Sequence, residues 1–406
     1  MHSKFYTFFV PFLFLLALCV SLEANGKKEA LAYLNSTRVA SGLIPFRQNS
    51  FLEKAATSHA KYIIRNQISG HTEKKGKYSY SGRKPSQRVR NAGYGSSFTM
   101  ENVSINAKNE HNAIDTLYSA IYHRLVFLNM EHDEIGLGSY STSKKRRLVR
   151  AYVYDFGASS IVKMCTKKYK LIPNTYYTNH VCKKDATVIP WGIYKSNLAK
   201  IVLQNPAVVW YPYPSQTEVS PAFYNESPDP LPGYKVSGFP ISVQFNESNY
   251  KKVKLLKFRL YDEDGKEVKK VKILQKKNDK NHLFSAYEFA LMPLKRLEYH
   301  TKYSVYFSAL ADGKKVEKRW AFKTKSFQDK FYRLTKKKKK LTAKKGETLV
   351  LYSVPMSKKD VLRNYSARGG LKVSFLDQNT LKIHFTRKGK ATLKLSNKRT
   401  VSFAIK

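Results

Sequence analysis

The pattern of apolar and polar residues predicts helices in the first third of the chain. Between residues 50 and 68 the apolar residues fall on one helical stripe, and Ser50 is placed to cap the helix. Similar spacing predicts an earlier helix from about Lys28 to Val39 and a third from about residue 112 to residue 128. The stripe of the central helix is formed by Phe51, Leu52, Ala55, Ala56, His59, Ala60, Ile63, Ile64 and Ile68.

After the third helix the apolar residues recur at every second position, which is the period of a strand. Ile135 to Gly138 and Leu148 to Phe156 predict two strands, joined by a polar turn around residues 141–145. Helices and strands together over residues 27–158 predict an α/β sandwich.

The remaining chain predicts a connector and two all-β modules. Residues 159–235 are rich in proline and aromatic residues and have weak periodicity, which is typical of a connector that packs in part onto a neighbour. Asp264-Gly265 and Asp312-Gly313 each separate alternating segments, a strong hairpin signal. Residues 236–327 predict an immunoglobulin-like or fibronectin-like β-sandwich, and residues 328–406 predict a second small β domain.

Residues 1–24 predict an export signal peptide rather than a structural element. A basic start precedes an apolar run from Phe8 to Val20, and cleavage is expected after Ser21 or after Ala24. The alternative is a lipid-anchored Cys19, against which Leu18 argues because that position normally holds a small residue. The run is shorter than the roughly 18 to 20 apolar residues of a spanning helix, so no transmembrane segment is expected after export.

Positive charge is the outlying feature of the composition. The chain has 74 Lys and Arg against 29 Asp and Glu, a net charge of +45, while 42% hydrophobic residues argue against disorder. For an exported protein this charge favours anionic envelope partners, namely lipopolysaccharide, lipid headgroups or wall polymers, and no nucleic acid is expected. The alternative is a solvated lysine-rich surface without a partner, and the run Lys336 to Lys340 is expected on an exposed edge or loop.

Two cysteines remain after signal removal. In an oxidising compartment Cys165 and Cys182 predict a disulfide that closes a local loop. They do not make a zinc site by themselves.

Four ionisable residues stand out beside the predicted elements: His71, Glu101, His123 and Glu134. Each has a structural explanation when taken singly. A histidine beside Gly70 can help to end a helix, and a glutamate before a strand is usually solvated.

The flanks of these four residues resemble the CAP superfamily of cysteine-rich secretory proteins, antigen 5 and pathogenesis-related 1, in its bacterial SCP-type form. Residues 50–72 resemble the family's second helix and first cleft histidine, and residues 88–94 its helix before the glutamate motif. Glu101-Asn102 is similar to the Gly-Glu-Asn motif, and residues 120–129 with 134–138 are similar to runs of the bacterial members.

The resemblance implies an α-β-α sandwich in which His71, Glu101, His123 and Glu134, the predicted tetrad, converge in one cleft. Two imidazoles and two carboxylates are suitable ligands for a divalent metal such as zinc, with a position left for water. The family cleft is not generally established as catalytic, and the sequence offers no serine, cysteine or lysine nucleophile with an adjacent base.

Two departures from the family lie beside the predicted tetrad. Tyr122 and Met100 stand where the family has glycine, so bulk there would narrow or tilt the cleft. His59 lies on the apolar stripe and is expected in the core, whereas His132 is expected in a solvated loop.

These observations favour an exported binding module of the bacterial envelope or secretome over an enzyme. One alternative is a metal-dependent hydrolase that acts on a wall or peptide substrate through the predicted tetrad. The other is a protein that binds a lipid or another apolar ligand in the CAP domain.

Overall fold

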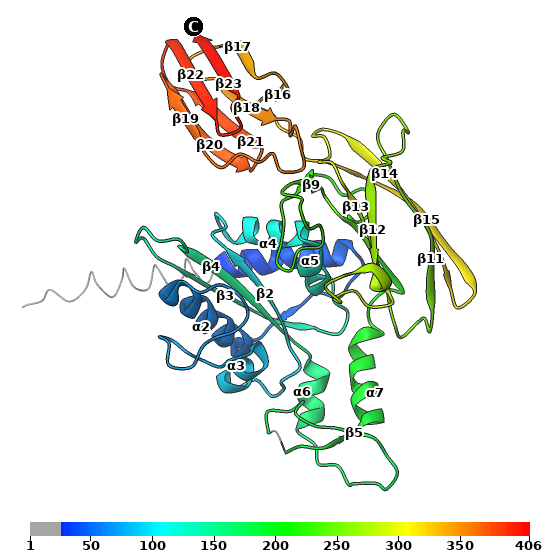
Figure 1. Cartoon of the computed structure of the whole chain (residues 1–406). Coiled ribbons are helices and arrows are strands. Elements are labelled where there is room, and N and C mark those ends of the chain that lie inside the picture. The colour runs from blue at the N-terminus through cyan, green and yellow to red at the C-terminus, as the bar shows by residue number, and fades with distance from the viewer. Residues whose placement is uncertain (1–25, 185) are drawn as a thin grey trace, which may run out of the picture. The chain divides into compact units, whose positions relative to one another are not determined.

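The structure is a computed structural model that describes residues 26–184 and 186–406, so the predicted signal peptide lies outside the described residues. The described chain divides into two compact units (Figure 1). The first holds the described residues up to Tyr118 together with Tyr122–Val209 and Asn246–Asn249, and the second holds Ser119–Ile121, Trp210–Phe245 and Tyr250–Lys406. Within these ranges no helix is long and apolar enough to cross a membrane.

A four-stranded sheet forms the centre of the first unit. Its order is β1 (Arg47–Gln48), β3 (Glu134–Ser141), β4 (Arg150–Gly157) and β2 (Met100–Ile105). The β1 and β3 strands are parallel, and the other neighbours are antiparallel. Every residue of β4 after Arg150 is buried, which means that both faces of this strand are covered.

Helices cover the two faces of this sheet (Figure 1). On one face lie α2 (Ser50–Asn66) and α3 (Pro85–Ala92), and on the other lie residues 26–40, α4 (Glu110–Ser119) and α5 (Ile121–Phe127). Alternate residues of β4 face opposite sides, as the strand period requires. Val153 packs with α2, whereas the rings of Tyr154 and Phe156 contact Phe127 of α5. The domain is therefore an α-β-α sandwich.

Two glycines allow α2 to lie directly on β3. A Cβ atom at Gly136 would lie 2.0 Å from the backbone nitrogen of Glu53, and one at Gly138 would lie 2.2 Å from the carbonyl carbon of Ala56. Real Cβ contacts are never this short, so the packing of α2 on the sheet requires glycine at both positions.

Three details of the predicted helices are wrong. The α2 helix is capped by the Asn49 side chain, which accepts from the backbone of the first turn, and not by Ser50. Phe51, expected on the buried stripe, is exposed. The single helix expected over residues 112–128 is divided at Ala120, and the buried Arg124 side chain donates to the Tyr118 carbonyl across this break at 2.6 Å.

The segment after the sandwich contains more regular structure than a connector requires. It has two helices, α6 (Ser159–Cys165) and α7 (Trp191–Val202). It also has two short pairs of strands. In the first, β5 (Tyr177–Thr178) pairs with β6 (Ile189–Pro190), and in the second, β8 (Ala222–Phe223) pairs with β9 (Ser237–Gly238). A further strand, β7 (Val208–Tyr211), joins a sheet of the next module. Ser160 of α6 donates to the Asn197 carbonyl of α7 at 2.7 Å.

The first β module has two sheets. One has the order β12 (Val271–Gln275), β13 (Glu288–Pro293), β10 (Ile241–Phe245) and β7, and a short helix η1 (Lys276–Asn278) follows β12. The other has the order β11 (Val253–Tyr261), β14 (Lys302–Ala311) and β15 (Lys314–Lys323), with the predicted Asp312-Gly313 turn between β14 and β15. Aromatic residues fill the core: Trp210, Phe245, Phe258, Phe289, Phe307 and Trp320.

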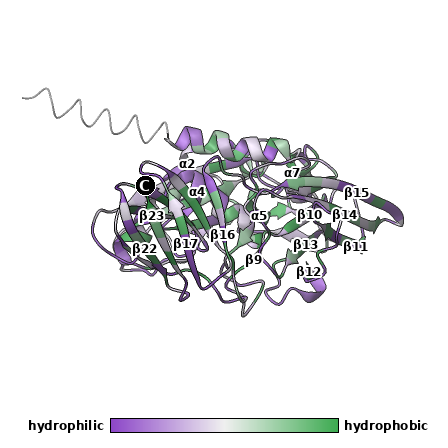
Figure 2. Ribbon diagram, turned by 90° about the horizontal axis from the view of Figure 1, so that it is seen from above, coloured by the Kyte–Doolittle hydropathy of each residue, from purple (hydrophilic) through white to green (hydrophobic). Residues whose placement is uncertain are grey.

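The last β module packs two four-stranded sheets around an aliphatic core, and apolar and polar residues alternate along its strands (Figure 2). One sheet has the order β16 (Lys330–Leu334), β18 (Thr348–Ser353), β21 (Thr380–Phe385) and β20 (Leu371–Asp377). The other has the order β17 (Lys338–Ala343), β23 (Thr400–Ile405), β22 (Gly389–Leu395) and β19 (Tyr365–Arg368). The lysine run lies at the start of the edge strand β17, as expected.

A buried ion pair joins the two β modules within the second unit. Arg296 of the first module donates to the Asp377 carboxylate at 2.7 Å, and the hydroxyl groups of Tyr224 and Tyr299 donate to the same carboxylate. Burial acts to raise the pKa of Asp377, but the Arg296 charge and the tyrosine hydrogen bonds hold that pKa below its ordinary value.

Candidate functional site

Two members of the predicted tetrad, His71 and Glu101, are in direct contact. Glu101 projects from β2 and is buried, and its Oε1 atom lies 2.8 Å from Nδ1 of His71. His71 follows Gly70, which adopts a φ of 109° just after α2. The His71 side chain is 45% exposed, so one end of this pair is buried and the other meets solvent.

Arg88 of α3 neutralises the second oxygen of Glu101. Its guanidinium contacts Glu101 Oε2 and also donates to the His71 carbonyl at 3.0 Å, and its side chain is fully buried. Burial acts to raise the pKa of Glu101, but the His71 hydrogen bond and the charges of His59 and Arg88 lower it to below its ordinary value. Glu101 is therefore ionised inside the fold.

Asp155 of β4 is a second carboxyl group beside Glu101, because the two residues are paired across β2 and β4. Neither Asp155 oxygen has a hydrogen-bonding partner of ordinary geometry among the described residues. Burial, followed by the negative charge of Glu101, raises the pKa of Asp155 well above its ordinary value. Asp155 is therefore held as the neutral acid.

His59 of α2 is a fully buried core histidine, as expected, and it has polar partners on both ring nitrogens. Nδ1 lies 2.9 Å from Glu73 Oε1, and Nε2 lies 2.9 Å from the Gly70 carbonyl. Glu73 also accepts from the backbone nitrogen of Ser81 at 2.6 Å. We refer to the five residues that meet here as the buried charge network: His59, Glu73, Arg88, Glu101 and Asp155.

Glu134 has its own partners. Its Oε2 accepts from the Tyr94 hydroxyl at 2.7 Å, and its Oε1 accepts from the Asn49 side chain at 3.2 Å. Burial, with the Glu134 charge, raises the pKa of Tyr94 strongly. Glu134 thereby fixes Tyr94 and the residue that caps α2.

His123, the remaining member of the predicted tetrad, lies on α5. Its backbone carbonyl accepts from the Asn102 side chain at 2.9 Å, which ties α5 to the strand that carries Glu101. Alternation along β2 directs Asn102 to the face opposite Glu101.

The four side chains do not fit a shared metal ion in this arrangement. Hydrogen-bond donors occupy both oxygens of Glu101 and both oxygens of Glu134. Over residues 26–184 and 186–406, no three His, Cys, Asp or Glu side chains are grouped so that they could hold a metal. We derive no chemical step through a metal.

The expectation that His132 is solvated is wrong. His132 is buried, its ring stacks on Phe98 with centroids 4.7 Å apart, and Nδ1 lies 2.8 Å from the Asn129 side-chain oxygen. Burial, assisted by the charge of Arg38, lowers the pKa of His132 to about 3. The aromatic partner lies 34 residues earlier in the chain, so local polarity gave no signal of this contact.

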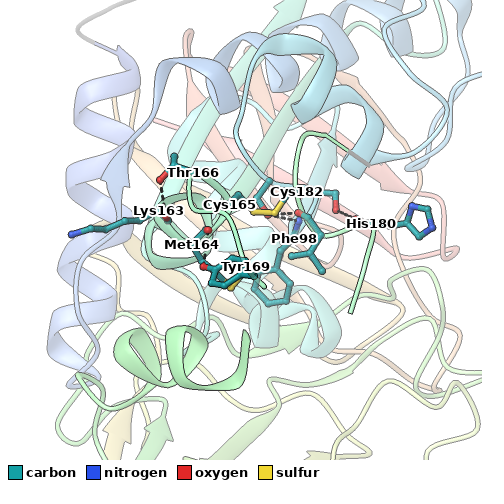
Figure 3. Close-up of a disulfide and its surroundings, with 11 residues drawn as sticks. Phe98, Lys163, Met164, Cys165, Thr166, Tyr169, His180 and Cys182 are labelled. Carbon is teal, nitrogen blue, oxygen red and sulfur yellow. Dashed lines mark hydrogen bonds between the residues drawn. A yellow bond between two sulfur atoms is a disulfide. The ribbon is translucent and has the colours of Figure 1, made fainter. Parts of the chain in front are cut away.

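A disulfide joins Cys165 at the end of α6 to Cys182, with Cα atoms 5.4 Å apart (Figure 3). Tyr169 lies beside it and donates to the Met164 carbonyl at 2.9 Å. Backbone bonds between residues 95–97 and 181–183 fasten the Cys182 end, with Ser97 donating to the Val181 carbonyl at 2.7 Å. The loop is thus closed by a covalent bond and attached to the sandwich.

A family comparison bears on the domain that carries this site. The family model of the cysteine-rich secretory protein family, CAP, matches residues 31–156, the span of the α-β-α sandwich. Residues 31–156 are a CAP domain. The prediction of a CAP domain followed by a β-rich region is therefore confirmed. None of the curated proteins matches this chain.

Solved structures are similar to parts of the chain. An outer surface protein from Borrelia burgdorferi is 19% identical, with a TM-score of 0.29, and the match covers 33% of this chain and 92% of that protein. An extracellular protein containing an SCP domain from Bacillus anthracis is 17% identical, with a TM-score of 0.28, over 32% of this chain and 39% of that one. Fibronectin(III)-like modules of Clostridium thermocellum CbhA are 13% identical, with a TM-score of 0.17, over 49% and 94%.

Proposed function

We propose that this chain is an exported binding protein, not an enzyme, and that exposed cations of its β-rich region hold it on an anionic component of the cell envelope. The predicted signal peptide and the Cys165–Cys182 disulfide support export, because disulfides persist in oxidising compartments. In the CAP domain one of the two carboxylates that the family resemblance singles out, Glu101, is already neutralised by Arg88 and His71.

The observation that carries the proposal is the outer face of the β17-β23-β22-β19 sheet. Residues of these strands that alternate with the buried core positions point outward. Five exposed cations lie on this surface, which we call the cationic face: Lys338, Lys340, Arg368, Lys390 and Lys394. None of the five forms an ion pair with another described residue.

The register arranges these cations in rows across the sheet. Lys338 lies opposite Thr400, which lies opposite Lys394, and Lys340 lies opposite Ser402 in the next row. On β17, Lys338 and Lys340 are two residues and about 6.6 Å apart, and on β22, Lys390 and Lys394 are four residues and about 13 Å apart. The outward residues of strand β23 are all small: Thr400, Ser402 and Ala404. The cations therefore lie on both sides of a strand whose short side chains leave room for an anionic chain or headgroup.

The outer face of the β11-β14-β15 sheet provides an internal contrast. Two of its cations are paired with carboxylates on the surface, since Lys315 lies 2.6 Å from Glu317 and Arg259 lies 3.4 Å from Glu267. Arg319 lies over the ring of Tyr306. Some cations of this sheet are therefore neutralised by carboxylates of described residues, whereas none of the five on the cationic face is.

The test compares two five-residue variants of equal charge for retention on envelope fractions at low and high salt. In the first, the five residues of the cationic face are replaced by Gln. In the control, exposed lysines of the first β module are replaced by Gln: Lys254, Lys257, Lys302, Lys314 and Lys323. We expect the first variant to be released at lower salt than the wild type and the control to be retained. Wild-type partitioning that does not change with salt would overturn the proposal.

One observation favours a metal-dependent hydrolase as the second candidate, although the predicted tetrad does not hold a metal in the arrangement described above. The hydrogen bond from His71 Nδ1 to a buried carboxylate orients the ring and leaves the opposite nitrogen on the exposed side, as in many histidines that bind metals. Stoichiometric zinc in the exported protein, lost in a His71→Ala, His123→Ala double variant, would support this candidate. Absence of metal together with no activity on wall polymers would exclude it.

A further inference from the structure

Exposed apolar side chains are concentrated around the disulfide-closed loop of the first unit. Leu171 is 71% exposed, Ile172 56%, Tyr176 86% and Trp191 46%. Monomeric proteins rarely leave several large apolar side chains together in solvent unless they meet a partner. These four residues, with the adjacent exposed Val188, are called the apolar patch here.

Hydrogen bonds bring the residues of the patch together, although they lie up to 20 residues apart in the chain. The Tyr177 hydroxyl bonds the backbone of Ile172, donating to its carbonyl at 2.9 Å. The backbone nitrogen of Trp191 donates to the Tyr176 carbonyl at 2.8 Å, beside the β5–β6 pair. The Cys165–Cys182 disulfide closes the base of the loop.

The charge around the patch identifies the kind of partner. Between residues 159 and 204 the sequence has one acidic residue, Asp185, and a set of lysines: Lys163, Lys167, Lys168, Lys170, Lys183, Lys184, Lys195 and Lys200. The ammonium group of Lys195 lies 6.0 Å from the centre of the Trp191 ring. Aliphatic side chains, flanking Tyr and Trp, and surrounding lysines are the combination that suits an anionic lipid interface.

We propose that the apolar patch inserts into the headgroup region of an anionic lipid bilayer while the surrounding lysines contact lipid phosphates. Leu171 and Ile172 enter the acyl boundary, Tyr176 and Trp191 lie at the headgroup level, and the chain does not cross the membrane. Because the disulfide and the β5–β6 pair already hold these side chains outward, binding requires little ordering of the loop. This contact is additional to the cationic face, and it uses apolar groups that the cationic face lacks.

The experiment measures co-sedimentation of the purified full chain with vesicles of phosphatidylglycerol and phosphatidylethanolamine, and with vesicles of phosphatidylcholine alone. We expect binding to the anionic vesicles only, weakened by salt. Replacement of Leu171, Ile172 and Tyr176 by Ser should reduce the partition coefficient by about tenfold or more, since most of the inserted apolar surface is lost. The tryptophan emission of the chain, to which Trp191 contributes together with Trp210 and Trp320, should shift to shorter wavelength on binding.

A matched control replaces exposed apolar residues outside the patch: Val39→Ser, Leu256→Ser and Met356→Ser. It should bind vesicles as the wild type does. Equal binding by the patch variant and the wild type would overturn the inference, and so would a change in oligomeric state of the patch variant without a change in vesicle binding. If the patch variant loses vesicle binding but the cationic-face variant is retained on envelope fractions, the inference stands and the proposed function fails.

Discussion

The CAP domain has a cluster of charged residues in its interior, whereas the last β module has a row of charged residues on the outer face of one sheet. The surroundings of the charges differ between the two regions. In the CAP domain, Glu101 is buried against the Arg88 guanidinium, with the His59 ring beside it, so its charge is met by an opposite one. On the cationic face, Lys338 and Lys394 are exposed on a sheet that has a complete apolar core of its own. Burial of a charge is costly unless it is paired, whereas an exposed charge costs little.

This difference separates residues that maintain the fold from residues available for binding. The carboxylates of Glu73 and Glu101 in the buried charge network are already occupied by donors of the fold, so changes there should act on stability. The cationic face contributes nothing to the core, so changes there should act on partners. Each of the following substitutions tests that division.

The largest effect is expected from Arg88→Met. It leaves Glu101 buried without its guanidinium partner, and loss of one member of a buried pair costs about 3 to 5 kcal/mol. Urea unfolding followed by circular dichroism should show this loss, and the double variant Arg88→Met, Glu101→Leu should recover much of it. A single variant as stable as the wild type would contradict the pairing.

A pH dependence is expected from His132. Its folded pKa of about 3 lies below that of the unfolded chain, so the unfolded state takes up a proton first as the pH falls. The contribution of His132 to the free energy of unfolding is therefore complete above the unfolded pKa of about 6.5. It falls by up to about 1.4 kcal/mol per pH unit as the pH decreases toward 3. His132→Phe, which keeps the stacking on Phe98, should flatten the stability curve between those values, and an unchanged slope would contradict the burial of a neutral ring.

Asp155→Asn should stabilise the domain at neutral pH. The pKa of Asp155 is higher in the folded than in the unfolded chain. The contribution of Asp155 to the free energy of unfolding is therefore complete at low pH and is lost as the pH rises above the unfolded pKa. A neutral amide of the same shape avoids this loss and can donate to Glu101, for a gain of about 1 kcal/mol at pH 7. The difference between variant and wild type should disappear at low pH, and destabilisation at pH 7 would show that the Asp155 carboxyl is needed.

The smallest effect on stability is expected from the five Gln substitutions on the cationic face. Exposed residues without ion pairs usually change stability by no more than about 0.5 kcal/mol each, and removal of mutual repulsion can offset that. Thermal unfolding should therefore be close to that of the wild type while envelope retention falls. A large drop in melting temperature would show that these cations are needed for the stability of the fold, which contradicts the division drawn above.

The sequence could predict elements whose signal is local. The apolar stripe of α2 and the hairpin at Asp312-Gly313 are determined by short-range periodicity and turn chemistry, and the structure has both. The family resemblance pointed to Glu101 and His71, which are in contact.

The rest depends on contacts between distant segments. Arg88 appeared in the sequence only as part of a helix, and its role is visible once α3 lies beside β2. Asp155 lies in an apolar run, and its neutral state follows from its register opposite Glu101. Burial of His132 likewise requires the ring of Phe98, a tertiary partner that no local pattern specifies.

The disulfide has a consequence for proteolysis of the protein. The segment from Thr166 to Val181 is mostly exposed and has several lysines, which makes it a natural substrate for trypsin. A cut there leaves both fragments joined through Cys165 and Cys182. A nicked molecule should therefore migrate as one band without reductant and as two bands after reduction, and its sandwich and β modules should stay covalently connected.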